Sequence, residues 1–235
     1  MLAQRHIADI QWGSVADALL ENGFGRIGNL LSRSECCELR GVYAEPERFR
    51  SRIEMERFRF GRGEYQYFRY PLPELVSTLR HELYDGVAPL ANEWMAALRM
   101  DSTFPHDLES FLRQCRARGQ SRPTPLLLRY RAGDFNCLHQ DIYGELTFPF
   151  QVILSLSDPV TDYSGGELLL IEQRPRAQSR GHVIQLAQGE GVVITTRFRP
   201  VKNACGTYRA NVRHGVSTVT AGERFTLGII FHDSK

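Results

Sequence analysis

Apolar residues recur at helical spacing along the first half of the chain. This rhythm, together with cap and stop residues, predicts helices over residues 14–23, from 32–34 onward, over 73–98 and over 106–118. The longest of them opens at Pro73. We expect it to break at Asp85-Gly86 or at Pro89, because proline cannot donate the backbone hydrogen bond that continues a helix.

After Pro123-Thr124-Pro125 the pattern changes to short runs of β-branched and aliphatic residues separated by Gly, Asp and Pro turn signals. There are seven such runs: LLLRYR, FQVILSLS, ELLLIEQ, HVIQLAQ, GVVITTRF, ANVRHGVSTV and RFTLGIIF. This spacing favours a sandwich or barrel over a parallel sheet. We therefore predict an α+β protein in which a mainly helical region, residues 1–122, with a β-hairpin near 55–70, supports a β-sheet core, residues 123–235, within one integrated domain.

The net charge supports no argument about binding to nucleic acid or membranes, because 29 basic and 27 acidic residues leave a formal charge of only +2. No stretch reaches the roughly 18 apolar residues of a membrane span, and the N-terminus lacks the apolar core of a secretory signal. We expect a cytoplasmic protein without membrane contact, and we infer no obligate protein partner. Reduced thiols are expected for the five cysteines, Cys36, Cys37, Cys115, Cys137 and Cys205.

The first candidate for chemistry is His139-Gln140-Asp141. In extended chain, residues two apart face the same side, so the imidazole and the carboxylate can reach one ion. Two imidazoles and one carboxylate would form the facial triad that holds non-haem Fe(II) with open positions. The candidate third ligands are His182, His214 and His232.

Only His214 is followed ten residues later by a basic residue, Arg224, in a strand-like sequence. A guanidinium fork binds a carboxylate bidentately, as the far end of a chelating 2-oxo diacid would require. A tight hairpin about Ala221-Gly222 would place Arg224 roughly 16 Å along the strand from His214, too far for a five-carbon diacid. The connection must therefore cross between two sheets, as in a jelly roll.

The segment LLLRYRAGDFNCLHQD and the His214–Arg224 spacing resemble the Fe(II)/2-oxoglutarate-dependent oxygenases, whose core is a double-stranded β-helix. Tyr130, nine residues before His139, matches a tyrosine of both AlkB-type repair dioxygenases and prolyl-4-hydroxylase-like enzymes. LHQD is similar to the AlkB type, whereas the ten-residue gap and DYSGGEL are similar to the prolyl-hydroxylase type. The two subfamily signals disagree.

Most of the chain resembles a bacterial family of 2-oxoglutarate oxygenases predicted to demethylate damaged nucleic-acid bases oxidatively. The match includes GRGEYQYFRYPLP, RPTPLLLRY, CLHQDIYGEL, EQRPRAQSR and RHGVSTVTAGERFTLGIIFHD. The resemblance implies that His139, Asp141 and His214 hold Fe(II), and that Arg224 and Tyr130 anchor the distal carboxylate of 2-oxoglutarate. Dioxygen is then consumed to hydroxylate a C–H bond, and an N-methyl group so hydroxylated is lost as formaldehyde. Cys137 is implied to be a neighbour of the metal rather than a ligand.

Local charge bears on the substrate. Lysine occurs only at positions 202 and 235, so 27 of the 29 basic residues are arginine, which suits phosphate and carboxylate contacts. Between Gln173 and Gly222 eight basic residues meet Glu190 alone, which favours an anionic partner. The eight are Arg174, Arg176, Arg180, Arg197, Arg199, Lys202, Arg209 and Arg213. We predict substrate contacts for Arg174, Arg176, Arg197, Arg199 and Arg213, and for Asn136 and Gln151 beside the metal strands.

A second stretch, Glu47 to Tyr70, alternates arginine with Phe and Tyr. This mixture suits phosphate contact with base stacking, but it is more typical of a half-buried strand with a solvated outer face. The leading hypothesis is oxidative demethylation of an alkylated base in DNA or RNA. The alternatives are a peptidyl hydroxylase of the prolyl type, whose acidic peptide would also suit a basic rim, and a metal- or nucleic-acid-binding barrel without turnover.

Overall fold

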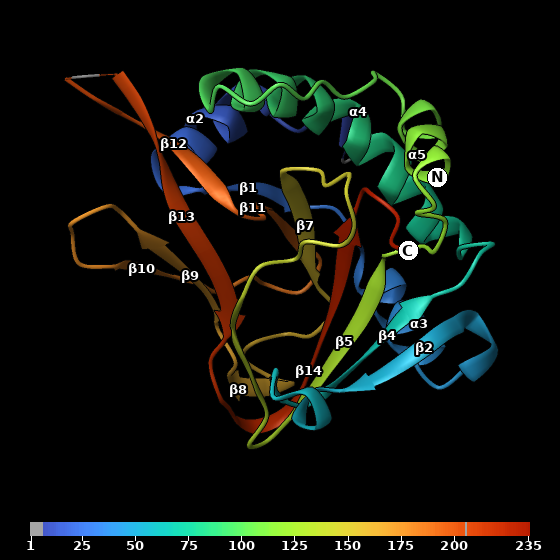
Figure 1. The fold of residues 1–235 in the computed structure, drawn as a ribbon. Helices are drawn as coiled ribbons and strands as arrows, with labels where there is room; N and C mark the ends of the chain where they lie inside the picture. The colour runs from blue at the N-terminus through green and yellow to red at the C-terminus, as the bar shows by residue number, and fades with distance from the viewer. Residues whose placement is uncertain (1–6, 205) are drawn as a thin grey trace.

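The computed structural model describes residues 7–204 and 206–235, which form two antiparallel sheets with helices packed against the larger one (Figure 1). The helices are α2 (Trp12–Asn22), α3 (Arg33–Val42), α4 (Glu74–Ala97) and α5 (Leu108–Ala117), with the 3-10 turns η1 (Pro46–Arg48) and η2 (Met55–Phe58). Each predicted helix is present, and the expected combination of helices with an antiparallel β core is confirmed.

The larger sheet has the strand order β1 (Phe24–Asn29), β11 (Glu190–Thr195), β7 (Phe150–Ser155), β14 (Val219–Ile230), β5 (Leu126–Arg131), β4 (Glu64–Phe68) and β2 (Phe49–Glu54), with β8 (Tyr163–Gly165) paired to β14. The smaller sheet has the order β10 (Arg180–Ile184), β9 (Leu168–Gln173), β13 (Gly206–Val216), β6 (Phe135–His139) and β3 (Gly61–Arg62), with β12 (Phe198–Asn203) paired to β13.

Each of the seven predicted runs overlaps a strand: β5, β7, β9, β10, β11, β13 and β14. The N-terminal region also contributes strands, because β2 and β4 form a hairpin with Phe49 opposite Phe68. β4 pairs with β5 and β1 pairs with β11. Strands from both halves of the sequence therefore share the larger sheet.

The predicted break in the longest helix is wrong, because α4 runs without interruption and contains Pro89. Pro89 lies on the exposed side of the helix, where water can satisfy the carbonyl group that loses its N–H partner. Gly86 has a packing role instead: a Cβ atom there would lie 2.1 Å from the indole ring of Trp12. The glycine lets α2 and α4 approach each other closely.

The connection between β13 and β14 crosses from the smaller to the larger sheet at Ser217 and Thr218. This confirms the crossing predicted from the distance between His214 and Arg224. His214 and Arg224 lie on strands that follow each other in the sequence, but their side chains reach one cavity from opposite sheets.

No helix in the described part of the chain is long and apolar enough to span a membrane. Four cysteines are free thiols, with Cys36 and Cys115 buried and Cys37 and Cys137 exposed. Cys205 lies outside the described residues.

Candidate active site

Three side chains that could ligate a metal converge between the sheets. His139 ends β6 and His214 lies directly opposite it on β13, with the ring centroids 4.2 Å apart. Asp141 follows β6 and points at both rings: its Oδ2 lies 3.1 Å from Nε2 of His214, and its Oδ1 lies 3.5 Å from Nε2 of His139. One ligand atom from each residue falls within 4.8 Å of the others, which is close enough to surround a single ion.

The three residues differ in the direction of their pKa shifts. Burial alone would lower the pKa of His139, but the hydrogen bond to Asp141 outweighs it and raises this pKa. Burial alone would raise the pKa of Asp141, but hydrogen bonds from His139 and His214 outweigh it and hold the pKa well below the usual value. Burial lowers the pKa of His214, so this imidazole is neutral near pH 7. An ionised carboxylate beside a neutral imidazole offers free electron pairs to a metal ion.

The triad opens into a cavity of about 300 Å³ lined by both sheets. Tyr130 of β5 and Arg224 of β14 reach it from the larger sheet, and they occupy directly opposed positions of the two strands. Arg224 is 4% exposed, and its guanidinium carbon lies 5.5 Å from the centre of the Tyr130 ring. The positive charge of Arg224 and the three candidate metal ligands therefore line the same cavity.

In the described part of the chain, Arg224 forms no ion pair with a carboxylate. Among the described residues, its Nε and Nη1 atoms are buried without a hydrogen-bond partner. Leaving a buried guanidinium unpaired is costly, so such a group is expected to receive an anion. Gly166 makes room for it, because a Cβ atom at that position would lie 3.0 Å from Cδ of Arg224.

The residues present fit Fe(II) and 2-oxoglutarate. Two imidazoles and one carboxylate are the donor set of the Fe(II) facial triad, which leaves positions for a chelating co-substrate and for dioxygen. The unpaired guanidinium of Arg224 fits the far carboxylate of a dicarboxylic acid.

Asn136 and Gln151 also line this cavity, as placed by the sequence-based prediction. The Asn136 side chain donates to the Tyr130 hydroxyl at 3.4 Å. Nε2 of Gln151 lies 3.2 Å from Nε2 of His214. Asn136 thus orients a residue beside Arg224, and Gln151 lies beside the triad.

The five arginines predicted to contact substrate are not among the described residues that line the cavity. Arg199 is buried and forms an ion pair with Glu172, to which Arg174 is also bonded, at 2.5 Å. Arg176, Arg197 and Arg213 are exposed. The charge count missed Glu172 because this residue lies one position before the counted segment. It lies two residues from Arg174, and strand pairing brings it beside Arg199.

The two other candidate ligands lie outside the triad. His232 is fully buried, and its Nδ1 accepts a hydrogen bond from the backbone N–H of Phe148 at 3.1 Å. His182 of β10 packs against Phe24, with ring centroids 5.4 Å apart. Both histidines have structural contacts instead.

Sequence reasoning missed Tyr143, whose hydroxyl donates a 2.6 Å hydrogen bond to Oδ1 of Asp141. It also missed Tyr163, whose ring centre lies 6.0 Å from the guanidinium carbon of Arg224. The position of Tyr143, two residues after Asp141, was a usable signal. No local pattern marks Tyr163, because the pairing of β8 with β14 brings it to the site.

Comparison with known proteins agrees with this geometry. The family Oxygenase-NA, described as "Oxygenase, catalysing oxidative methylation of damaged DNA", matches residues 63–234. The Mycobacterium tuberculosis proteins MT2286 (strain CDC 1551) and Rv2227 (strain H37Rv), both named as uncharacterized, are each 52% identical over 167 residues, which cover 71% of this chain and 72% of theirs.

Two solved structures resemble the fold. A Pseudomonas putida prolyl-4-hydroxylase is 16% identical, covers 96% of this chain and 100% of its own, and has a TM-score of 0.56. An oxidoreductase of the 2OG-Fe(II) oxygenase family from Burkholderia pseudomallei is 16% identical, with 96% and 93% covered and a TM-score of 0.53. The description of the family as an oxygenase argues against a barrel without turnover. The chain belongs to the Oxygenase-NA family and is an oxygenase, an oxidoreductase, whose site fits Fe(II), 2-oxoglutarate and dioxygen.

Proposed function

We propose that His139, Asp141 and His214 hold the iron, and that Arg224, with Tyr130 beside it, binds the distal carboxylate of 2-oxoglutarate. The observation that carries this proposal is the unpaired guanidinium of Arg224 in the cavity of the triad. The two facing antiparallel sheets support a double-stranded β-helix as the core, residues 123–235, to which the N-terminal region adds helices and further strands.

The proposed reaction is oxidative demethylation of an alkylated base in nucleic acid. When bound, Fe(II) and 2-oxoglutarate use dioxygen to hydroxylate a C–H bond, with release of succinate and carbon dioxide. One oxygen atom enters succinate and the other enters the N–CH₃ group, giving N–CH₂OH, which breaks down to N–H and formaldehyde. The description of the family supports damaged DNA as the substrate class. The methyl group is lost because its hydroxylated form, N–CH₂OH, releases formaldehyde.

The protein's own groups prepare this site. Asp141 stays ionised because both histidines donate to it, and Tyr143 fixes the orientation of its carboxylate. Arg224 and Tyr130 come from paired positions on neighbouring strands, so the larger sheet fixes the distance between them. Asp141, His214 and Arg224 are buried, which strengthens these charge contacts.

The test is formaldehyde release from methylated DNA and RNA oligonucleotides by purified enzyme supplied with Fe(II) and 2-oxoglutarate. We expect release by the natural sequence and by His182→Ala, because His182 lies outside the triad. His139→Ala should release none while retaining the thermal unfolding midpoint. Absence of both formaldehyde and oligonucleotide-stimulated succinate formation would refute the proposed substrate.

A peptidyl hydroxylase is the second candidate. It is favoured by the ten-residue spacing of His214 and Arg224 and by the DYSGGEL segment, in which Gly166 lies against Arg224. Its product would be a protein or peptide whose mass has increased by one oxygen atom. Succinate formation that is stimulated by peptides and not by oligonucleotides would favour this reaction over the first.

A further inference from the structure

A short segment that we call the strap, Met55–Arg62, lies beside the mouth of the active-site cavity. It comprises η2 and β3, and β3 pairs with β6, the strand that carries His139. The backbone N–H of Cys137 donates to the Phe60 carbonyl oxygen at 2.8 Å. Gly61 permits this approach, since a Cβ atom there would lie 2.4 Å from the carbonyl oxygen of Phe135. Arg59 and Phe60 line the cavity itself.

The strap presents two aromatic rings to solvent. Phe58 is 51% exposed and Phe60 is 47% exposed, and the rings stack with centroids 5.5 Å apart and planes 19° from parallel. Leu138, which also lines the cavity, is exposed nearby. Exposed aromatic side chains grouped at the mouth of a cavity mark a binding surface more than a packing defect.

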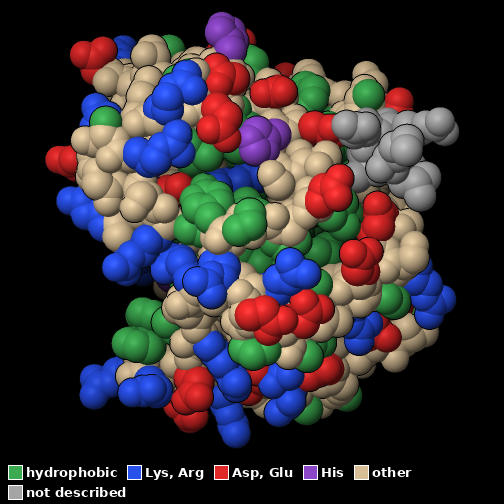
Figure 2. All heavy atoms as spheres, turned by 90° about the vertical axis from the view of Figure 1, so that its right-hand side faces the viewer, with side chains coloured by type: hydrophobic (Ala, Val, Ile, Leu, Met, Phe, Trp, Pro, Cys, Tyr) green, Lys and Arg blue, Asp and Glu red, His purple; other side chains and the backbone are tan. Residues whose placement is uncertain are grey.

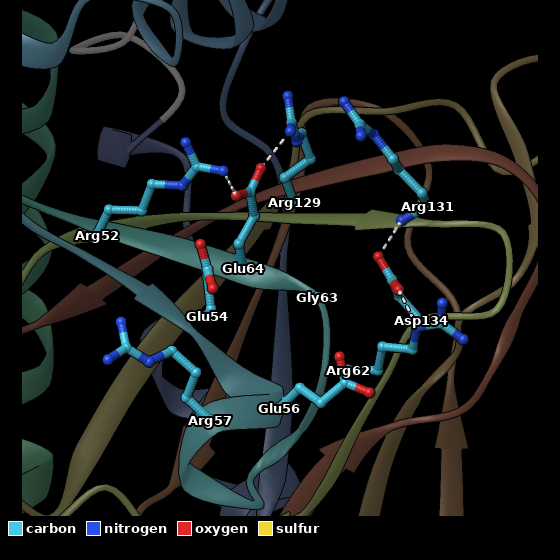
Figure 3. Close-up of a pocket in the computed structure, with 10 residues that line it drawn as sticks. All are labelled: Arg52, Glu54, Glu56, Arg57, Arg62, Gly63, Glu64, Arg129, Arg131 and Asp134. Carbon is cyan, nitrogen blue, oxygen red and sulfur yellow. Dashed lines mark hydrogen bonds and ion pairs between the residues drawn. The ribbon is translucent and has the colours of Figure 1, made fainter.

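Ion pairs divide the arginines around the strap into two groups. On the larger sheet, Arg52 and Arg129 both pair with Glu64, and Arg62 of β3 pairs with Asp134 (Figure 3). The pocket formed there, of about 410 Å³, is thus lined by interleaved opposite charges. Figure 2 shows the same interleaving of basic and acidic side chains over most of the neighbouring face. Five arginines and four carboxylates line this pocket, so it carries a net charge of only +1.

Arg57 and Arg59 belong to the second group. In the described part of the chain neither one has an ion-pair partner, although the nearby Glu54 and Glu56 line the charged pocket together with Arg57. The unpaired positive charge of this region therefore lies on the strap, next to Phe58 and Phe60. The stretch that alternates arginine with Phe and Tyr therefore contains two kinds of arginine: those held in ion pairs, and those on the strap that are available to a ligand.

We propose that the strap binds an unpaired strand of nucleic acid, with Phe58 and Phe60 stacking on a base and Arg57 and Arg59 contacting its phosphates. This inference rests on the proposed function and specifies the form of its substrate. Stacking on exposed rings requires a base whose face is free, as in single strands. Two of the three ligands point the same way, because the Asp141 and His214 side chains are only 10% and 7% exposed, against 35% for His139. A base must leave its helical stack to reach them.

The test is equilibrium binding of unmodified fluorescent oligonucleotides, single-stranded and duplex, to the full-length protein without 2-oxoglutarate. Single strands should bind more tightly than duplexes. The double variant Phe58→Leu/Phe60→Leu should weaken single-strand binding by about tenfold to a hundredfold, the usual effect of losing a stacked base. Phe58→Tyr/Phe60→Tyr should retain binding, because tyrosine also stacks. Arg57→Gln/Arg59→Gln should lower the salt dependence of binding, with a slope smaller by about 0.7 for each phosphate that the variant no longer neutralises.

Two control variants make the same kinds of change, loss of an arginine and loss of exposed apolar surface, at positions away from the strap. Arg69→Gln removes an exposed arginine at the other end of β4 from the strap, and Val160→Ala trims an apolar side chain that is 87% exposed. Both should leave binding unchanged, and the unfolding midpoint of every variant should match that of the natural protein.

The outcomes separate this inference from the proposed function. Single-strand binding that survives the leucine variant, or equal affinity for duplex, would overturn the role of the strap while methylated oligonucleotides could still be oxidised. Binding that depends on the strap without formaldehyde release would support the strap and refute the proposed reaction. Binding of neither nucleic-acid form, with release from neither, would refute both.

Discussion

The Tyr143 hydroxyl donates a 2.6 Å hydrogen bond to Oδ1 of Asp141, the carboxylate that also receives hydrogen bonds from His139 and His214. This contact uses one lone pair of the carboxylate and fixes the direction of the others. A metal ligand held in this way loses less freedom when the ion binds, which is why such supporting contacts affect metal affinity.

Tyr143→Phe should therefore weaken Fe(II) affinity by about tenfold to a hundredfold, the usual effect of removing a supporting partner of a ligand. Metal titration of the protein, with no substrate present, measures this directly. Tyr84→Phe is the control, because it removes a buried hydroxyl that donates to Pro105 at 2.9 Å, away from the triad. Unchanged metal affinity in Tyr143→Phe would show that Asp141 needs no support.

Arg224→Gln should raise the KM for 2-oxoglutarate by about 30-fold or more, because the variant leaves a buried carboxylate without its charged partner. Fe(II) affinity should change much less, since Arg224 is placed to contact the co-substrate and not the metal. Arg131→Gln is the matched control: its side chain is 64% exposed on the same sheet. Equal losses of iron and 2-oxoglutarate binding would mean that the role of Arg224 is misassigned.

The triad was predictable from the sequence because two of its three ligands lie close together along the chain. His139 and Asp141 are two residues apart on an extended segment, and His214 was selected by the distance to Arg224. The crossing between β13 and β14 was predicted by the same distance and is present. The fold was predictable where apolar runs were long, as in β7 and β14.

Pairings that depend on tertiary structure were not predictable. Glu172 reaches Arg199 because β9 and β12 both pair with β13, which no count along the sequence detects. Its contact with Arg174 is local, two residues along the chain. The helix through Pro89 persists because its exposed side tolerates a missing hydrogen bond. The strand β1 escaped notice because it is short and extends a sheet built by distant residues. The hairpin predicted near 55–70 includes β4, but its other strand, β2, lies earlier, at Phe49–Glu54.

Glu172 should make stability depend on pH. Burial alone would raise the pKa of Glu172, but hydrogen bonds from Arg199 and Arg174 outweigh it and hold the pKa below the ordinary value of 4.5. A carboxyl group with a lowered folded-state pKa stabilises the fold above the unfolded-state value, and this stabilisation is lost as the pH falls through the folded-state value.

Glu172→Gln should lower the free energy of unfolding at pH 7 by about 3–5 kcal/mol, because it leaves buried Arg199 without a counter-charge. The difference from the natural protein should stay constant above pH 4.5 and narrow below it, where Glu172 of the natural protein also becomes neutral. Urea unfolding across this range measures both effects. A difference that persists unchanged at low pH would show that charge is not its source.

Arg80 joins α4 to the end of the chain and should be the most sensitive arginine for stability. Its side chain is 1% exposed, forms an ion pair with Asp233 at 2.9 Å and donates to the carbonyl oxygens of Ile230 and Phe231. Arg80→Ala should lower the free energy of unfolding by about 3–5 kcal/mol, because Asp233 is left charged and buried. Arg48→Ala, which breaks an exposed pair with Glu45, should cost about 0–1 kcal/mol. Urea unfolding at pH 7 compares them, and equal costs would contradict the importance assigned to burial.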